Sequence, residues 1–281
     1  MTTSVFATLP PDWQAWIRDN LARACSPHDM ADSMARSGQY SMAFARAAIG
    51  EALGADSLAA LGQREGMPQV DTSSNRLAVD DRAVDILCAL RQPRVVLLGN
   101  VLGEDECDAI VAHCDGRYAR STVTSEEDGA STVHDGRTSE MAFIQRGECA
   151  LADRIEQRLA VIAQWPVERG EPFQLQKYGV AQEYRPHFDW LNPDSDGHRA
   201  HLRRGGQRLA TFILYLSDVE QGGGTAFPNI GLEVFPRKGN ALFFLNTDAS
   251  RRPDQQTLHA GCPVVCGTKI IANKWLRAGV Y

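Results

Sequence analysis

The stretch YRPHFDW, residues 184–190, places a histidine and an aspartate two positions apart in a run that is typical of a β-strand. Side chains at positions i and i+2 of a strand point to the same face of the sheet. We therefore expect His187 and Asp189 to project side by side, as two ligands of one metal ion must. A second such pair, His113 and Asp115, falls at the end of an expected helix, where side chains two apart diverge by about 200°. That second pair is not expected to bind a metal.

A third ligand for such a site has to come from elsewhere in the chain. His259 lies in TLHAGCPV, on an expected strand 70 residues after Asp189. Two histidines and one carboxylate on one face of an octahedron leave three positions free, the arrangement of non-haem Fe(II) oxygenases. Zinc bound by the same three side chains is the alternative, although no H-E-x-x-H pattern supplies the usual general base.

Lys269 follows His259 by 10 residues, in the apolar run GTKIIANKW. A lysine on an apolar strand is costly to bury unless it pairs with an anion. A dicarboxylate that chelates the metal with one end would supply this anion at its other end. The alternative is an edge-strand lysine that reaches solvent.

The composition is that of a globular protein. The 281 residues are 43% hydrophobic and 23% charged, enough for one large domain or two smaller ones. A net charge of −6 argues against a nucleic-acid partner. No apolar run has the length of a membrane span, and the first residues lack a signal-peptide pattern. Seven scattered cysteines indicate reduced thiols, so we expect a cytoplasmic protein.

Hydrophobic periodicity divides the chain into a helical and a β-rich part. Three short amphipathic helices are expected before residue 64, and residues 64–76 form a polar linker. We therefore predict a helical N-terminal segment over residues 1–76 and a second domain over residues 77–281. At the start of the second domain, periodicity predicts a helix over residues 80–90, a strand over 93–102, and helices over 103–116 and 149–165.

From residue 172 the chain consists of short β runs separated by turns, and no helix is expected between them. This pattern indicates an antiparallel sandwich or jelly roll. The basic polar stretch at residues 192–207, which contains His198 and His201, is expected to be a loop. The predicted fold is thus α+β, a double-stranded β-helix (jelly-roll) domain with flanking helices, preceded by a small all-α segment.

Three runs of this β region resemble the catalytic domain of prolyl 4-hydroxylases, which are Fe(II)- and 2-oxoglutarate-dependent dioxygenases. They are LQKYGVAQEYRPHFDW, RLATFILYLSDVEQGGGTAFPNIGLEVFPRKGNALFF and LHAGCPVVCGTKIIANKWL. The resemblance covers roughly residues 90–281. It implies that His187, Asp189 and His259 bind the iron and that Lys269 pairs with the distal carboxylate of 2-oxoglutarate.

The resemblance also assigns roles to three further residues. Tyr178 and Thr211 match positions that help to hold 2-oxoglutarate, and Trp275 matches an aromatic residue that lines the site. The alternative readings are structural: a cross-strand aromatic, a β-forming threonine and a core tryptophan. Arg137, in the lead-in run RTSEMAF, is expected either to serve the substrate or to stabilise the fold. The implied cofactors are Fe(II), 2-oxoglutarate, O2 and L-ascorbate.

The implied activity is hydroxylation of a substrate C–H bond, with release of succinate and CO2. The expected substrate is a prolyl residue in a protein or peptide, because a separate helical segment suits docking of a macromolecule better than handling of a metabolite. The alternatives are a 2-oxoglutarate oxygenase of free amino acids or metabolites, and a non-catalytic iron- or oxygen-sensing interaction module. Neither a nucleic acid nor a membrane is expected as a partner.

Overall fold

The structure is a computed structural model that describes residues 4–23, 25, 27–53, 66–79, 82–124, 131–248 and 250–281. The chain divides into two compact units. The first comprises Met1–Met67 and Asp71–Asn75, and the second comprises Pro68–Val70 and Arg76–Tyr281.

The first unit is a small helical bundle with its own core. It contains η1 (Phe6–Thr8), α1 (Pro11–Ala22), α2 (Pro27–Arg36) and α3 (Met42–Leu53), so the three predicted helices are confirmed. Pro11 begins α1, where its missing N–H costs no helical hydrogen bond. One fully buried side chain from each helix, Ile17, Met34 and Ile49, meets the others in this core.

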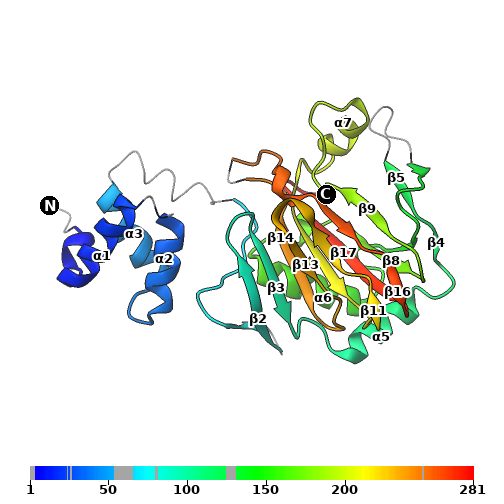
Figure 1. Ribbon diagram of the computed structural model, residues 1–281, viewed down its shortest axis with the longest axis horizontal. Helices are drawn as coiled ribbons and strands as arrows, with labels where there is room; N and C mark the ends of the chain where they lie inside the picture. The colour runs from blue at the N-terminus through cyan, green and yellow to red at the C-terminus, as the bar shows by residue number, and fades with distance from the viewer. Residues whose placement is uncertain are drawn as a thin grey trace. The chain divides into compact units, whose positions relative to one another are not determined.

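The second unit is built on a nine-stranded antiparallel sheet (Figure 1). Across the sheet, the strands are β1 (Arg76–Val79), β2 (Arg82–Leu90), β3 (Val95–Gly99), β14 (Ala241–Leu245), β10 (Arg208–Tyr215), β17 (Lys269–Arg277), β8 (Phe173–Tyr178), β7 (Glu140–Ile144) and β4 (Ala119–Arg120). The central strand β10 is buried along almost its whole length, which explains why its sequence is continuously apolar.

A second sheet of four short strands completes the jelly roll. Its order is β13 (Leu232–Val234), β12 (Thr225–Phe227), β15 (His259–Gly261) and β9 (Tyr184–His187). Two further strand pairs are β11 (Gln221–Gly222) with β16 (Val264–Cys266), and β5 (Thr122–Thr124) with β6 (Ser131–Val133). Side chains from both larger sheets form one core, among them Ile213, Tyr215, Phe227 and Phe244. The predicted jelly roll is therefore confirmed.

Helices accompany the sheets. The predicted helices near residues 103–116 and 149–165 are confirmed as α5 (Glu104–His113) and α6 (Ala150–Ala163). Figure 1 shows α6 behind the large sheet. The remaining helical elements are α7 (Asp196–Arg203), η2 (Val167–Arg169), η3 (Pro228–Ile230) and η4 (Gln255–Thr257). Among the described residues, no helix is long and apolar enough to cross a membrane.

The helix predicted over residues 80–90 is wrong. The described part of this stretch is strand β2, which pairs with β1 on one side and β3 on the other. Its alanines and leucines favour a helix, but the two neighbouring strands satisfy its backbone groups on both sides. Tertiary pairing therefore overrides local propensity here.

The prediction of a helix-free loop at residues 192–207 is also wrong, because α7 lies within it. The Ser195 hydroxyl accepts a hydrogen bond from the backbone N–H of His198 at 3.3 Å and so caps the first turn. The helix is eight residues long and mostly polar, so it has no extended apolar stripe that periodicity could detect.

A buried ion pair joins α5 to α6. Arg158, whose side chain is 1% exposed, donates from Nη1 and Nη2 to the two carboxylate oxygens of Glu106, both at 2.8 Å. Burial acts to raise the pKa of Glu106, but the hydrogen bonds from Arg158 and the Gly103 N–H outweigh it and lower this pKa to about 2. Glu106 is therefore ionised throughout the physiological pH range.

Arg158→Ala should strongly destabilise the protein, because it removes both side-chain hydrogen bonds of the buried Glu106 carboxylate and leaves it only the longer ion pair with Arg82 at 3.4 Å. We expect the free energy of unfolding to fall by about 3–5 kcal/mol in urea denaturation. Arg154→Ala, at an exposed position of the same helix, is the control and should change it by less than about 0.5 kcal/mol. Equal effects of the two substitutions would show that the ion pair does not stabilise the fold.

Candidate active site and metal centre

Three side chains from the small sheet converge on one point. His187 ends β9 and His259 begins β15, and the two residues are register partners in this antiparallel pair. Asp189 lies two residues beyond the end of β9, so it is not on the strand as the sequence predicted. Its Oδ1 is 3.9 Å from His187 Nε2, and its Oδ2 is 3.7 Å from His259 Nε2. One ligand atom from each of the three residues lies within 4.8 Å of the others.

Both histidines are held in the tautomer that a metal requires. His187 Nδ1 lies 2.8 Å from Arg185 O, and His259 Nδ1 lies 3.0 Å from Thr257 O. A carbonyl oxygen only accepts, so each Nδ1 carries a proton, and Nε2 is the nitrogen left to bind a metal. Burial, together with the nearby His259, lowers the pKa of His187 to about 3, so this imidazole is neutral at pH 7.

The Asp189 carboxylate is fixed by a chain of two hydrogen bonds. Asn246 Nδ2 donates to Thr211 Oγ1 at 2.9 Å, and Thr211 Oγ1 donates to Asp189 Oδ2 at 2.8 Å. Burial raises the pKa of this carboxyl, but the two neighbouring histidines and the Thr211 hydroxyl outweigh it and hold the pKa below its usual range. The residue is therefore an ionised, oriented oxygen ligand.

Aromatic rings enclose the two histidines. The Tyr184 ring stacks on His187 with centroids 3.6 Å apart. The rings of Phe244 and Phe227 lie 4.9 and 5.6 Å from that of His259. These contacts restrict both imidazoles and keep water away from one side of the cluster.

Lys269 lies inside the fold rather than at an edge, so the solvent-reaching alternative is wrong. Its strand, β17, runs between β10 and β8, and the residue is 1% exposed. Its Nζ makes one long contact of 3.4 Å with Gly224 O. In the part of the chain that the structure describes, no carboxylate forms a salt bridge with this ammonium group. Burial lowers its pKa to about 8.

Tyr178 faces Lys269 across the β8–β17 pair. The two residues are register partners, and the ammonium group lies 5.5 Å from the centre of the Tyr178 ring. The phenol donates a hydrogen bond to the side-chain oxygen of Gln176, and burial raises its pKa to about 12. Tyr178 is thus a neutral phenol whose ring lies beside the ammonium group, where sequence similarity predicts a contact with 2-oxoglutarate.

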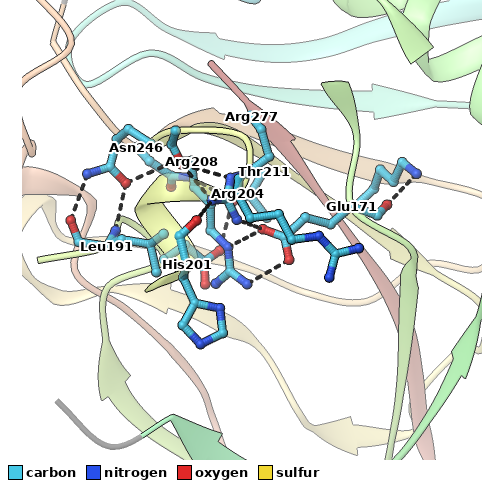
Figure 2. Close-up of polar contacts among 12 residues, drawn as sticks. Glu171, Leu191, His201, Arg204, Arg208, Thr211, Asn246 and Arg277 are labelled. Carbon is cyan, nitrogen blue, oxygen red and sulfur yellow. Dashed lines mark hydrogen bonds and ion pairs between the residues drawn. The ribbon is translucent and has the colours of Figure 1, made fainter. Parts of the chain in front are cut away.

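The metal-binding cluster opens into a cavity of about 760 Å³. Its lining includes His187 and Asp189, together with Arg137, Tyr184, Trp190, His201, Arg208 and Trp275. The Arg208 guanidinium stacks over the Trp275 ring at 3.8 Å, and Figure 2 shows this arginine in contact with Glu171. The Nε1 atoms of Trp190 and Trp275 are buried and have no hydrogen-bond partner among the described residues.

The structure thus brings His187, Asp189 and His259 together, puts Lys269 beside Tyr178, and places Trp275 in the cavity wall. Thr211 holds Asp189, and its predicted contact with 2-oxoglutarate stays a prediction. Arg137 lines the cavity and packs against the Tyr184 ring at 4.8 Å.

Sequence reasoning did not single out several residues of the site. They are Glu171, Tyr184, Arg208, Asn246 and Arg277. The sequence feature that could have indicated Arg208 is its position as a charged residue at the start of the apolar run RLATFILYL.

The donor set fits a divalent metal ion with open positions. Two imidazoles and one carboxylate are the ligands that non-haem iron takes, and zinc accepts them too. The ammonium group of Lys269, buried without a salt bridge in the described chain, fits the anionic end of a dicarboxylate.

Comparison with known proteins decides between these metals. A sequence profile described as the 2OG-Fe(II) oxygenase superfamily matches residues 173–277. Probable prolyl 4-hydroxylase 3 of Arabidopsis thaliana is 34% identical over 209 residues, which cover 68% of this chain and 71% of that protein. Prolyl 4-hydroxylase subunit alpha-1 of Rattus norvegicus is 36% identical over 186 residues, which cover 66% of this chain and 35% of that subunit.

A solved structure agrees with these relatives. The viral collagen prolyl hydroxylase from Paramecium bursaria Chlorella virus-1, in its 2OG complex, has a TM-score of 0.51 and 28% identity, covering 65% of this chain and 95% of that one. The chain belongs to the 2OG-Fe(II) oxygenase superfamily and, within it, to the prolyl 4-hydroxylase family. It spans about a third of the length of the animal α subunits that it matches.

Thr211→Val should weaken metal binding, because the isosteric side chain cannot hold the Asp189 carboxylate. We expect the dissociation constant for Mn(II), used in place of iron, to rise about 10- to 100-fold in calorimetric titration. Thr211→Ser keeps the hydroxyl and should bind the metal nearly as well as the unchanged protein. If both variants bind Mn(II) normally, the threonine does not position the ligand.

Binding of 2-oxoglutarate should weaken at alkaline pH. Lys269 has a lowered pKa, so the free protein loses this positive charge as pH rises through about 8. The dissociation constant should be flat below that pH and rise by up to about tenfold per pH unit above it. Calorimetry with Mn(II) under anaerobic conditions measures this dependence without turnover.

Lys269→Arg is the control, because a guanidinium stays charged over this pH range. The arginine variant should bind 2-oxoglutarate less well, yet without the alkaline loss of affinity. A pH profile shared by both proteins would exclude Lys269 as the titrating group.

Proposed function

We propose that this protein is an Fe(II)- and 2-oxoglutarate-dependent dioxygenase that hydroxylates a prolyl residue in a protein or peptide and releases succinate and CO2. One observation carries the proposal: a two-histidine, one-aspartate cluster opens into a cavity, and a buried lysine without a salt bridge in the described chain lies in the same jelly roll. Membership of the prolyl 4-hydroxylase family supports it.

The protein's own residues bind and orient the reactants. His187 and His259 would hold Fe(II) through Nε2, and Asp189 would hold it through one carboxylate oxygen. Lys269 would donate to the distal carboxylate of 2-oxoglutarate, with the Tyr178 hydroxyl beside it. The iron, the co-substrate and O2 supply the oxidising chemistry for attack on a C–H bond. The aromatic rings around the histidines keep that chemistry dry.

The cavity in front of the metal cluster suits a prolyl side chain. Its walls include the rings of Tyr184, Trp190 and Trp275, against which an apolar five-membered ring can pack. The separate helical unit with its own core offers a second surface for a macromolecular substrate.

A free amino acid is the second candidate substrate. The cavity volume of about 760 Å³ falls within the range of about 300–1,000 Å³ that is usual for small-molecule sites. A non-catalytic module is not favoured, because both histidines, the aspartate and the lysine are all present and oriented.

Two further proposals concern conditions. L-ascorbate would serve as a reductant that keeps the iron in the Fe(II) state. The seven cysteines are all free, which supports a reducing compartment such as the cytoplasm. The net charge of −6 supports a protein rather than a nucleic acid as the partner.

His187→Ala should abolish both metal binding and succinate formation, because two ligands do not hold Fe(II) tightly. Asp189→Glu should fail as well, since the longer side chain misplaces the carboxylate. His113→Ala is the matched control. His113 pairs with Glu148 and does not belong to the metal-binding cluster, so its replacement should leave turnover unchanged. Full turnover by the His187 variant in iron-repleted buffer would refute the metal site.

The substrate class is tested with Fe(II), 2-oxoglutarate and ¹⁸O2. Mass spectrometry of host proteins should find ¹⁸O on prolyl residues, and a synthetic peptide of Gly-Pro-Pro repeats should stimulate succinate formation more than free proline does. Label on free proline alone, with none on any peptide or protein, would refute the peptide substrate in favour of the second candidate.

A further inference from the structure

Part of the cavity wall is formed by the segment of residues 191–207, which contains α7. His198 and His201 of this helix line the cavity. The Gln207 side chain joins the two ends of the segment: it donates to Leu191 O and accepts from Leu191 N, both at 2.7 Å. These two hydrogen bonds therefore hold the two ends of the segment together.

Arg277, the last residue of β17, fastens this segment to the sheet. The side chain is 1% exposed. Nη2 donates to the backbone carbonyls of His201 and Arg204 (Figure 2), and Nε donates to that of Gly206 at 2.9 Å. Carbonyls at the C-terminal end of a helix lack helical partners, and a cation is favoured there. One guanidinium thus satisfies a backbone carbonyl in the last turn of α7 and the carbonyl of the residue that follows the helix.

The Glu171 carboxylate links the same guanidinium to Arg208, which lines the cavity. Arg277 Nη1 donates to Glu171 Oε1 at 2.8 Å, and Arg208 donates to both oxygens of this carboxylate at 2.6 and 2.9 Å. Arg208 and Arg277 are register partners on adjacent strands, where like charges repel. The Glu171 carboxylate lies between the two guanidinium groups and forms an ion pair with each of them, which offsets their repulsion (Figure 2). These ion pairs hold the Arg208 guanidinium over the Trp275 ring.

We propose that Arg277 is a positioning residue for the peptide substrate. It fixes α7 as a rigid wall of the cavity and, through Glu171, fixes the orientation of Arg208. The inference rests on the proposed function for the identity of the substrate, but the anchoring of α7 does not depend on it. Lysine cannot replace Arg277, because a single ammonium group cannot reach the carboxylate and three carbonyls in these different directions.

The anchoring is tested without substrate by amide hydrogen exchange of the whole protein. In Arg277→Gln, exchange over residues 196–206 should be at least about tenfold faster, because charge-assisted hydrogen bonds to the end of α7 are lost. Amides of β10 and β14 should keep their protection. Arg203→Ala removes an exposed guanidinium from the last turn of the same helix, and it should not change the exchange.

The positioning role is tested by kinetics with the Gly-Pro-Pro peptide. Arg277→Gln and Arg277→Lys should each raise the peptide KM about tenfold, with smaller effects on kcat and none on the KM for 2-oxoglutarate. Gln207→Ala loosens the other end of the segment without leaving a buried charge, so it serves if the Arg277 variants do not fold. It should raise the same KM.

A double variant tests whether Arg277 acts on Arg208 through Glu171. Glu171→Gln should also raise the peptide KM, and combining it with Arg277→Gln should cost clearly less than the product of the two single effects, since both act on one arginine. Unchanged exchange over residues 196–206 in both Arg277→Gln and Gln207→Ala would overturn the anchoring. A parallel rise in the KM values of peptide and 2-oxoglutarate, or independent effects in the double variant, would overturn the positioning role.

These outcomes are separable from a failure of the proposed function. If no peptide stimulates succinate formation by the unchanged protein, the prolyl substrate is refuted, and the exchange experiment still decides whether Arg277 anchors α7.

Discussion

The register between β9 and β15 is the constraint on which the metal-binding cluster depends. His187 and His259 are 72 positions apart in the chain, and they meet because they are partners in this antiparallel pair. A slip of one residue would turn one imidazole to the opposite face of the sheet and separate the ligands. The large sheet prevents this slip, since both sheets share a single core of interlocked aromatic and aliphatic side chains.

The site places several charges in an interior that would otherwise exclude them. Glu171 neutralises the repulsion between Arg208 and Arg277, and Asp189 is held by Thr211 and its neighbours. A buried charge that is paired and hydrogen-bonded is costly to move, so these groups form a rigid framework. Lys269 differs from them, because the described chain gives it no carboxylate partner, and that difference marks it for a ligand.

A single strand connects the inner and outer parts of the site. On β17, Lys269, Trp275 and Arg277 are separated by even numbers of residues, so the strand repeat puts them on the same face. Lys269 is the residue proposed to bind the co-substrate, Trp275 lies in the cavity wall, and Arg277 anchors α7. Lys274, at an odd separation from Lys269, points to the other face and pairs with Glu156 instead. The strand thus sets the distance between the co-substrate and the substrate wall.

The sequence by itself determined the chemical composition of the centre and the class of fold. His187, Asp189, His259 and Lys269 were identified from residue type and spacing together with family resemblance, and strand-length apolar runs predicted the jelly roll. It did not determine β2, where pairing with two strands overrides a helical propensity, or α7, which is short and mostly polar. Only the tertiary structure decided that Glu171, Arg208 and Arg277 form one network, since their contacts join strands and loops that lie far apart in the chain, and no local pattern encodes such contacts.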